Sequence, residues 1–146
     1  MIKVIDIVKQ FDDTIVLNHV STEMYDGQVN MIIGQSGSGK TVLLKSLIGL
    51  HSVDSGNILY MTSNGEQDLA RLKEKELRNL HREVGVLFQG SALFDSMTVL
   101  ENVMFPLDMF SDMSKSEREA RAKFCLMRVD IPERAYDLMP SEISGG

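Results

Sequence analysis

The sequence is poor in the residues that support several common protein classes. It has one cysteine, Cys125, so no internal disulfide can form, and a reducing compartment is expected. No apolar run approaches the roughly 18–20 residues that span a bilayer, which argues against direct membrane insertion. Residues 1–6 mix charged with apolar positions and lack the apolar core of a signal peptide. Secreted, disulfide-stabilised and membrane-spanning classes are therefore excluded.

Basic residues are also outnumbered. Fifteen Lys and Arg against 21 Asp and Glu give a net charge of −6. Nonspecific nucleic-acid binding depends on neutralising phosphates, so no nucleic-acid partner is expected. The three histidines, His19, His51 and His81, have no metal-ligand spacing and are interpreted as structural or surface residues. The 146 residues, 43% of them hydrophobic, are enough for a modest core.

Strand and helix patterns alternate in the first part of the chain. Five runs are apolar or rich in β-branched residues and are predicted strands, the third of them buried on both faces. These strands are residues 2–8, 14–24, 29–33, 57–61 and 84–88. Helical periodicity covers residues 39–50 and 71–82, the latter with Leu72, Leu77 and Leu80 on its inner side. A turn at Asn64-Gly65 follows the fourth strand. This alternation predicts an α/β fold.

The second part of the chain is predicted to be helical. Thr98 and Glu101 have the spacing of a capping box, and Ser114 and Glu117 repeat it, so each pair predicts a helix start. The helix after Ser114 places Ala120, Phe124 and Met127 on one face. Pro132 can open a short helix, and Pro140 is expected to mark its end. We therefore predict two domains, residues 1–89 and residues 90–146.

A glycine-rich motif joins the third predicted strand to the first predicted helix. Residues 34–41, Gly-Gln-Ser-Gly-Ser-Gly-Lys-Thr, match the pattern G-x-x-x-x-G-K-[ST] in the required strand–loop–helix context. Glycines let successive N–H groups point at phosphate oxygens, and the helix N-terminus adds a favourable field. Lys40 can reach the β- and γ-phosphates, and Thr41 can offer its hydroxyl to Mg²⁺. The motif predicts binding of a magnesium–nucleoside triphosphate. The alternative interpretation is a plain glycine-rich turn with an exposed lysine.

Two further segments narrow the choice among the protein families that share this phosphate-binding motif. Residues 86–89 end a strand in Gln89, and the chain closes on residues 142–146, Glu-Ile-Ser-Gly-Gly. With the phosphate-binding motif, these resemble the P-loop NTPases of the ATP-binding cassette (ABC) transporter family, whose signature reads Leu-Ser-Gly-Gly-Gln. The resemblance implies an N-terminal β-subdomain, a helical subdomain, and ATP with Mg²⁺ as cofactors. No Asn-Lys-x-Asp motif is present, which counts against a GTPase. A small-molecule P-loop kinase is a weaker alternative.

The resemblance assigns roles to individual residues. Phe11 is similar to the aromatic residue that stacks on adenine; the alternative is a core or hairpin phenylalanine. Gln89 is similar to the Q-loop glutamine, which lies near Mg²⁺ and the attacking water. The alternative is a surface glutamine at the end of a strand. Lys40 and Gln89 are thus the expected catalytic residues, and Thr41 and Gln89 the expected metal ligands. The nucleotide-binding residues implied are Phe11, Gly34, Ser36, Gly37, Ser38, Gly39, Lys40, Thr41, Val42, Ser144, Gly145 and Gly146.

The same resemblance implies partners. In the family, the Ser-Gly-Gly signature binds the γ-phosphate of ATP held by a second ATPase subunit, in a head-to-tail dimer. Transmembrane permease subunits are the other implied partners, and the location is cytoplasmic, peripheral on the inner membrane. Residues 88–103 look like the ATPase of Mla/Mce-type lipid transporters, which implies phospholipid transport. The alternatives are an ATPase of a phosphate or amino-acid importer, or a stand-alone nucleotide-binding module that does not hydrolyse ATP.

Part of the family pattern does not occur in the 146 residues. The Walker B strand ending in Asp-Glu and the histidine switch are both missing, and residues 128–131 lack the apolar run and the glutamate that could replace them. Phosphoryl transfer depends on such carboxylates to position water and Mg²⁺. We therefore expect ATP binding with little or no hydrolysis, and a chain that is the N-terminal piece of a longer ATPase.

Overall fold

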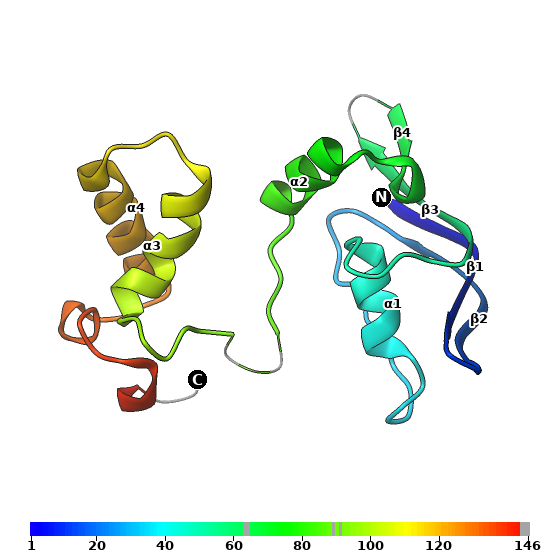
Figure 1. Cartoon of the computed structure of the whole chain (residues 1–146), viewed down its shortest axis with the longest axis horizontal. Helices are drawn as coiled ribbons and strands as arrows, with labels where there is room; N and C mark the ends of the chain where they lie inside the picture. The colour runs from blue at the N-terminus through cyan, green and yellow to red at the C-terminus, as the bar shows by residue number, and fades with distance from the viewer. Residues whose placement is uncertain (63–64, 89, 91, 144–146) are drawn as a thin grey trace. The chain divides into compact units, whose positions relative to one another are not determined.

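The protein forms two units joined near residue 86, as seen in a computed structural model (Figure 1). The structure describes residues 1–62, 65–88, 90 and 92–143. The first unit covers residues 1–86 and contains a β-sheet and helices, and the second begins at residue 87 and is helical. The predicted α/β class therefore holds for the described part of the chain.

The sheet of the first unit has four antiparallel strands in the order β2-β1-β3-β4. They are β1 (Ile2–Phe11), β2 (Thr14–Met24), β3 (Ser55–Thr62) and β4 (Gly65–Asp68). The central strand β1 pairs through Ile2 with Met24 of β2 and with Tyr60 of β3. Thr62 pairs with Gly65, so β3 and β4 form the hairpin expected at Asn64-Gly65, although Asn64 itself lies outside the described residues.

The β1–β2 ladder is irregular, with three shifts of register between Val4 and Gln10. At the first shift Asp6 has a positive φ of 52°, and His19 on β2 has a φ of 51°. The Asp6 carboxylate and the His19 ring lie 2.9 Å apart, and the Asp6 N–H donates to the Ser21 hydroxyl at 2.9 Å. Such bulges bend a strand and increase its twist.

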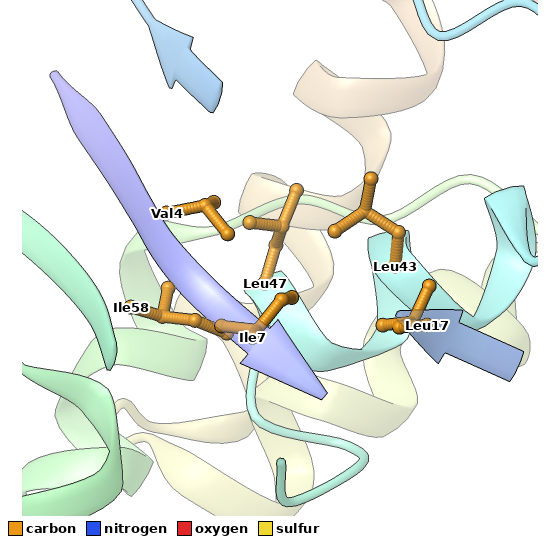
Figure 2. Close-up of a cluster of buried hydrophobic side chains, with 6 residues drawn as sticks. All are labelled: Val4, Ile7, Leu17, Leu43, Leu47 and Ile58. Atoms are coloured by element: carbon orange, nitrogen blue, oxygen red, sulfur yellow. The ribbon is translucent and has the colours of Figure 1, made fainter. Parts of the chain in front are cut away.

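Helix α1 (Lys40–Leu47) packs its apolar side on one face of this sheet. Figure 2 shows the resulting core, in which side chains of α1 meet those of β1, β2 and β3. Its members are Val4, Ile7, Leu17, Leu43, Leu47 and Ile58, each less than 10% exposed. Burial of these side chains holds α1, and therefore the loop before it, in place.

The predicted strand at residues 29–33 is absent, which corrects the sequence interpretation. Val29, Met31 and Ile33 are 91%, 76% and 83% exposed, and no strand of the described sheet pairs with them. Instead, Asn30 bonds locally: its amide donates to the Tyr25 carbonyl at 2.9 Å and its Oδ1 accepts from the Tyr25 N–H at 3.2 Å. Such local bonds compete with a sheet ladder, and strand propensity alone does not supply a partner.

The predicted strand at residues 84–88 is likewise non-regular in the structure. Leu87 is 98% exposed and Phe88 46% exposed. As for residues 29–33, no strand of the described sheet pairs with this segment, and strand propensity alone does not supply a partner.

The two helices of the first unit are shorter than their sequence patterns. Helix α1 ends at Leu47 rather than residue 50, because Gly49 adopts a left-handed φ of 72° and its N–H donates to the Ser46 carbonyl. In place of one helix over residues 71–82, the structure has a 3₁₀ turn, η1 (Leu69–Arg71), followed by helix α2 (Glu74–Glu83). The break follows from Leu72 and Lys73, whose ψ angles of 132° and 161° are extended.

The second unit contains the two helices that the capping boxes predict. Thr98 caps α3 (Val99–Phe110) with Glu101, and Ser114 caps α4 (Lys115–Arg128) with Glu117. Its core consists of Val99, Leu126 and Tyr136. The face of α4 singled out in the sequence is exposed, with Phe124 at 43% and Met127 at 57%, because Ala122 and Leu126 are the residues turned inward.

Two 3₁₀ turns complete the second unit. The turn η2 (Glu133–Ala135) follows Pro132, as the sequence predicts. The other prediction for this region was wrong: Pro140 begins a further 3₁₀ turn, η3 (Pro140–Glu142), rather than ending the first one. Proline is favoured at the first position of a helical turn because its missing N–H needs no partner there.

Candidate nucleotide-binding site

The glycine-rich motif folds into a loop that leads directly into α1. The Ser38 N–H donates to the Gln35 carbonyl at 3.2 Å, which closes a tight turn, and Lys40 is the first helical residue. Gly39 caps the helix with a φ of 87°, and its carbonyl accepts from the Leu43 N–H at 2.8 Å. The free N–H groups at this helix start are available to an anion.

Gly39 of the loop is required by its surroundings, while Gly34 lies close to a neighbouring side chain. A Cβ at Gly39 would lie 2.9 Å from the Val16 carbonyl oxygen and 3.2 Å from Leu17 Cδ2. A Cβ at Gly34 would lie 2.7 Å from the Ser38 hydroxyl oxygen. The loop can therefore rest against β2 only without a side chain at Gly39, whereas the exposed Ser38 side chain can rotate away from a Cβ at Gly34.

Lys40 carries the positive charge of the site. Its half-buried side chain folds into the loop, where Nζ donates to the carbonyls of Gly34 at 2.8 Å and Gln35 at 2.6 Å. These bonds hold the ammonium group on the inner side of the loop rather than in bulk solvent. No acidic residue occupies the first turn of α1, so the helix N-terminus adds its positive field to that of Lys40.

The remaining motif residues divide between solvent and core. Ser36, Gly37, Ser38 and Thr41 are exposed. Val42 is half-buried and packs against the core that holds α1, so its side chain anchors the helix. The Thr41 hydroxyl, on the first turn of α1, is of the type that binds Mg²⁺, which prefers oxygen ligands. Taken together, the glycine curl, the enclosed ammonium and the helix N-terminus suit a polyphosphate with Mg²⁺.

Phe11, the predicted adenine-stacking residue, ends β1 and is 39% exposed. Its ring meets the His51 ring edge to face, with centroids 5.4 Å apart, and Lys9 Nζ lies 5.3 Å from its centroid. Sequence reasoning had no signal for the pairing with His51, which is 40 positions away. At 39% exposure the ring is partly open to solvent, as stacking on a base requires.

Asp54 fixes the strand end that carries Phe11. Its carboxylate accepts from the Gln10 N–H at 2.7 Å and pairs with Lys9 Nζ at 3.0 Å. The hydrogen bond from Gln10, and then that from Lys9, hold the pKa of Asp54 below its ordinary value. The carboxylate form therefore persists at neutral pH and keeps this contact. Sequence reasoning assigned no role to Asp54.

Several predicted site residues cannot be located. Gln89, Ser144, Gly145 and Gly146 lie outside the described residues. In the described ranges, no cluster of three or more His, Cys, Asp or Glu side chains could hold a metal ion. The structure thus brings together the loop of residues 34–41 and places Phe11 on the same unit, while the roles of Gln89 and the signature stay predictions.

Comparison with known proteins identifies the class to which this loop and sheet belong. The ABC transporter family matches residues 17–146, and the chain belongs to this family through its ATPase domain. Among curated relatives, it is 34% identical to the phosphonates import ATP-binding protein of Fusobacterium nucleatum, over all of this chain and 60% of the relative. It is 36% identical to a methionine import ATP-binding protein of Rhizobium johnstonii, over all of this chain and 39% of the relative.

Solved structures agree in fold. The dimeric structure of a bacterial ABC transporter cassette matches with a TM-score of 0.83 and 30% identity, over 99% of this chain and 64% of that chain. The same identity, with a TM-score of 0.81, is found for a dimeric post-hydrolysis cassette bound to ADP and phosphate. The chain thus spans roughly two fifths to two thirds of the length of these proteins. Within the described residues, no helix is both long and apolar enough to cross a bilayer.

Proposed function

We propose that this chain is the nucleotide-binding part of an ATPase subunit that drives an ABC importer. The observation that carries the proposal is the loop of residues 34–41, in which Lys40 is held by the Gly34 and Gln35 carbonyls at the start of α1. Such a loop binds a polyphosphate through backbone N–H groups, a point charge and a helix N-terminus. ATP with Mg²⁺ is the ligand proposed, with Thr41 and Gln89 as the metal-contacting residues.

The proposal extends to the partners. We infer a head-to-tail dimer with a second ATPase subunit, to which Ser144, Gly145 and Gly146 contribute, and attachment to transmembrane permease subunits. The location would then be the cytoplasmic face of the inner membrane, without insertion into it. Support comes from family membership and from the dimeric state of the matched structures.

The transported substrate has two candidates. The relatives named above are import ATPases for phosphonates and methionine, which supports the importer alternative better than phospholipid transport. Phospholipid transport is the second candidate, and it rests on the Mla/Mce-like sequence of residues 88–103. The remaining alternative to a transporter subunit is a stand-alone nucleotide-binding module, and the matched family model and dimeric structures favour a transporter subunit over it.

The decisive test of the site is the substitution Lys40→Ala. Loss of the enclosed ammonium should weaken binding of a fluorescent ATP analogue at least tenfold, since charge-assisted bonds to phosphate contribute about 1.5–3 kcal/mol. Lys45→Ala, on the same helix but in its last turn, should bind as well as the original chain. Equal binding by the Lys40→Ala and Lys45→Ala proteins would overturn the assignment.

Turnover by these 146 residues should be close to background. They contain no Asp-Glu pair after an apolar run, so no carboxylate of that kind positions the attacking water. Release of inorganic phosphate from ATP, measured with the purified chain and its Lys40→Ala variant, should be indistinguishable between the two. A rate for the original chain at the level of a complete ABC ATPase would refute this expectation.

A further inference from the structure

The chain segment that follows α1, residues 48–54, connects the phosphate-binding helix to strand β1. Near its start, the Leu50 N–H donates to the Lys45 carbonyl of α1 at 2.8 Å. At its end, the Asp54 N–H donates to the Val8 carbonyl of β1 at 2.8 Å. The segment is therefore tied both to the helix that begins at the phosphate-binding loop and to the strand that ends in the predicted base-stacking residue.

The Phe11 ring is contacted from this segment and from its own strand. His51 is half-buried, and its ring meets the Phe11 ring with centroids 5.4 Å apart and an angle of 75° between the ring planes. Lys9 Nζ lies 5.3 Å from the centroid of the Phe11 ring and pairs with the Asp54 carboxylate at 3.0 Å. Both contacts depend on where the face and the edge of the ring point, so together they favour one orientation of Phe11.

A fixed orientation of this ring matters for a base that stacks on it. A side chain that is free to rotate loses that freedom when a ligand immobilises it, and the loss weakens binding. A ring that is already held in place before the ligand arrives avoids most of this cost. Lys9 lies on the same strand as Phe11, whereas His51 belongs to the segment after α1. His51 is thus the contact that relates the ring to the phosphate-binding helix.

We infer that His51 is a positioning residue for the base of ATP, because it holds the Phe11 ring in the orientation that stacks on adenine. The inference rests on the proposed ATP site and on the stacking role predicted for Phe11. It goes beyond both, since no sequence pattern gives His51 a part in nucleotide binding. His51 acts through Phe11, so it contributes to binding of the base and not to binding of the phosphates, which Lys40 and the loop of residues 34–41 contact.

The test compares ATP with ribose 5′-triphosphate, which has the same sugar and phosphates but no base. Dissociation constants are measured by calorimetry, with Mg²⁺ and the full 146-residue chain. Phe11→Ala should weaken ATP binding about fivefold or more, as is typical when a base loses its aromatic partner. His51→Ala should weaken it about threefold, because the ring then becomes ordered only on binding. Neither substitution should change the dissociation constant of ribose 5′-triphosphate. His51→Phe keeps an aromatic neighbour and should restore ATP binding.

His81→Ala is the matched control for a purely structural effect. The His81 ring bonds to the Ile48 carbonyl at 2.7 Å, so this histidine also contacts the segment of residues 48–54, but at the end next to α1. The ratio of the two dissociation constants should be the same in His81→Ala as in the original chain. His51→Leu keeps the bulk of the side chain without an aromatic ring, so it should repeat the effect of His51→Ala. Circular dichroism establishes that each variant is folded.

Three results would overturn the role of His51. The first is an unchanged ratio of dissociation constants in both His51→Ala and His51→Leu, and the second is an equal change of that ratio in His81→Ala. The third is equal binding of the two ligands by the original chain, which would remove the stacked base while leaving the phosphate-binding loop supported by loss of both ligands in Lys40→Ala. Binding of neither ligand by the original chain would instead overturn the proposed function itself, and this role with it.

Discussion

Gly39 combines a conformational and a steric requirement at the entrance to α1. Its φ of 87° is strained for residues with a Cβ, and a methyl group there would meet the Val16 carbonyl of β2 at 2.9 Å. Gly39→Ala is therefore expected to lower the free energy of unfolding by more than the roughly 1–2 kcal/mol that a left-handed residue alone costs. Urea denaturation without nucleotide measures this loss directly.

Gly37 provides the matched control for that substitution. Its φ is 80°, but nothing lies within 4 Å of a Cβ built on it. Gly37→Ala should therefore show the conformational cost alone, about 1–2 kcal/mol. If the two variants lost the same stability, the contact between the loop and β2 would not be a constraint on this position.

At the scale of elements, local chemistry predicted helices better than strands. Both capping boxes, at Thr98 and Ser114, are formed in the structure because each needs only residues three positions apart. The strands predicted at residues 29–33 and 84–88 are not formed, because a strand depends on neighbours that a local pattern cannot specify. The contact between Phe11 and His51 likewise had no signal in the sequence, because it joins residues 40 positions apart.

Removing the cap of α4 should destabilise the second unit. The Ser114 hydroxyl donates to the Glu117 carboxylate at 2.6 Å and accepts from the Glu117 N–H at 3.4 Å. Ser114→Ala is expected to reduce the free energy of unfolding by about 1 kcal/mol at pH 7, as is typical for this position. Ser96→Ala, at an exposed turn of the same unit, should change it little.

The contribution of this cap should depend on pH. Hydrogen bonds from the Ser114 hydroxyl and then its N–H lower the pKa of Glu117 below its ordinary value of 4.5. Since the folded state favours the carboxylate, the stability it adds is complete above that ordinary value and is lost as pH falls through the lowered pKa. The difference between the original chain and Ser114→Ala should shrink below about pH 4.5. A constant difference from pH 7 to pH 3 would exclude this role for Glu117.

For the whole molecule, we expect the exposed segment of residues 29–33 to promote association between chains. An exposed, apolar run with β-branched residues is a site for pairing between chains. Met31→Lys should lower light scattering on heating without lowering the melting temperature, because Met31 is 76% exposed. Met109→Lys, the same change at a position 59% exposed on α3, should reduce scattering less. Equal effects would point to general charge repulsion instead.

The α/β class and the phosphate-binding loop could be read from the sequence because each rests on short-range patterns. The loop needs only Gly34, Gly39 and Lys40 at fixed spacing between an apolar run and an amphipathic helix. By contrast, the all-antiparallel order of the sheet is set by long-range contacts. The register of Ile2 against both Met24 and Tyr60 is an example, since it joins residues far apart in the chain. Such pairings cannot be derived from local periodicity.

The displaced register of β1 against β2 has a consequence for how the hairpin assembles. With Asp6 and His19 both held in left-handed conformations, sliding one strand along the other would force these angles onto residues such as Ile5 or Val20. β-Branched residues resist them strongly. The register shifts therefore favour a single alignment of β1 with β2. This alignment fixes the positions of Val16 and Leu17, against which the phosphate-binding loop packs at Gly39.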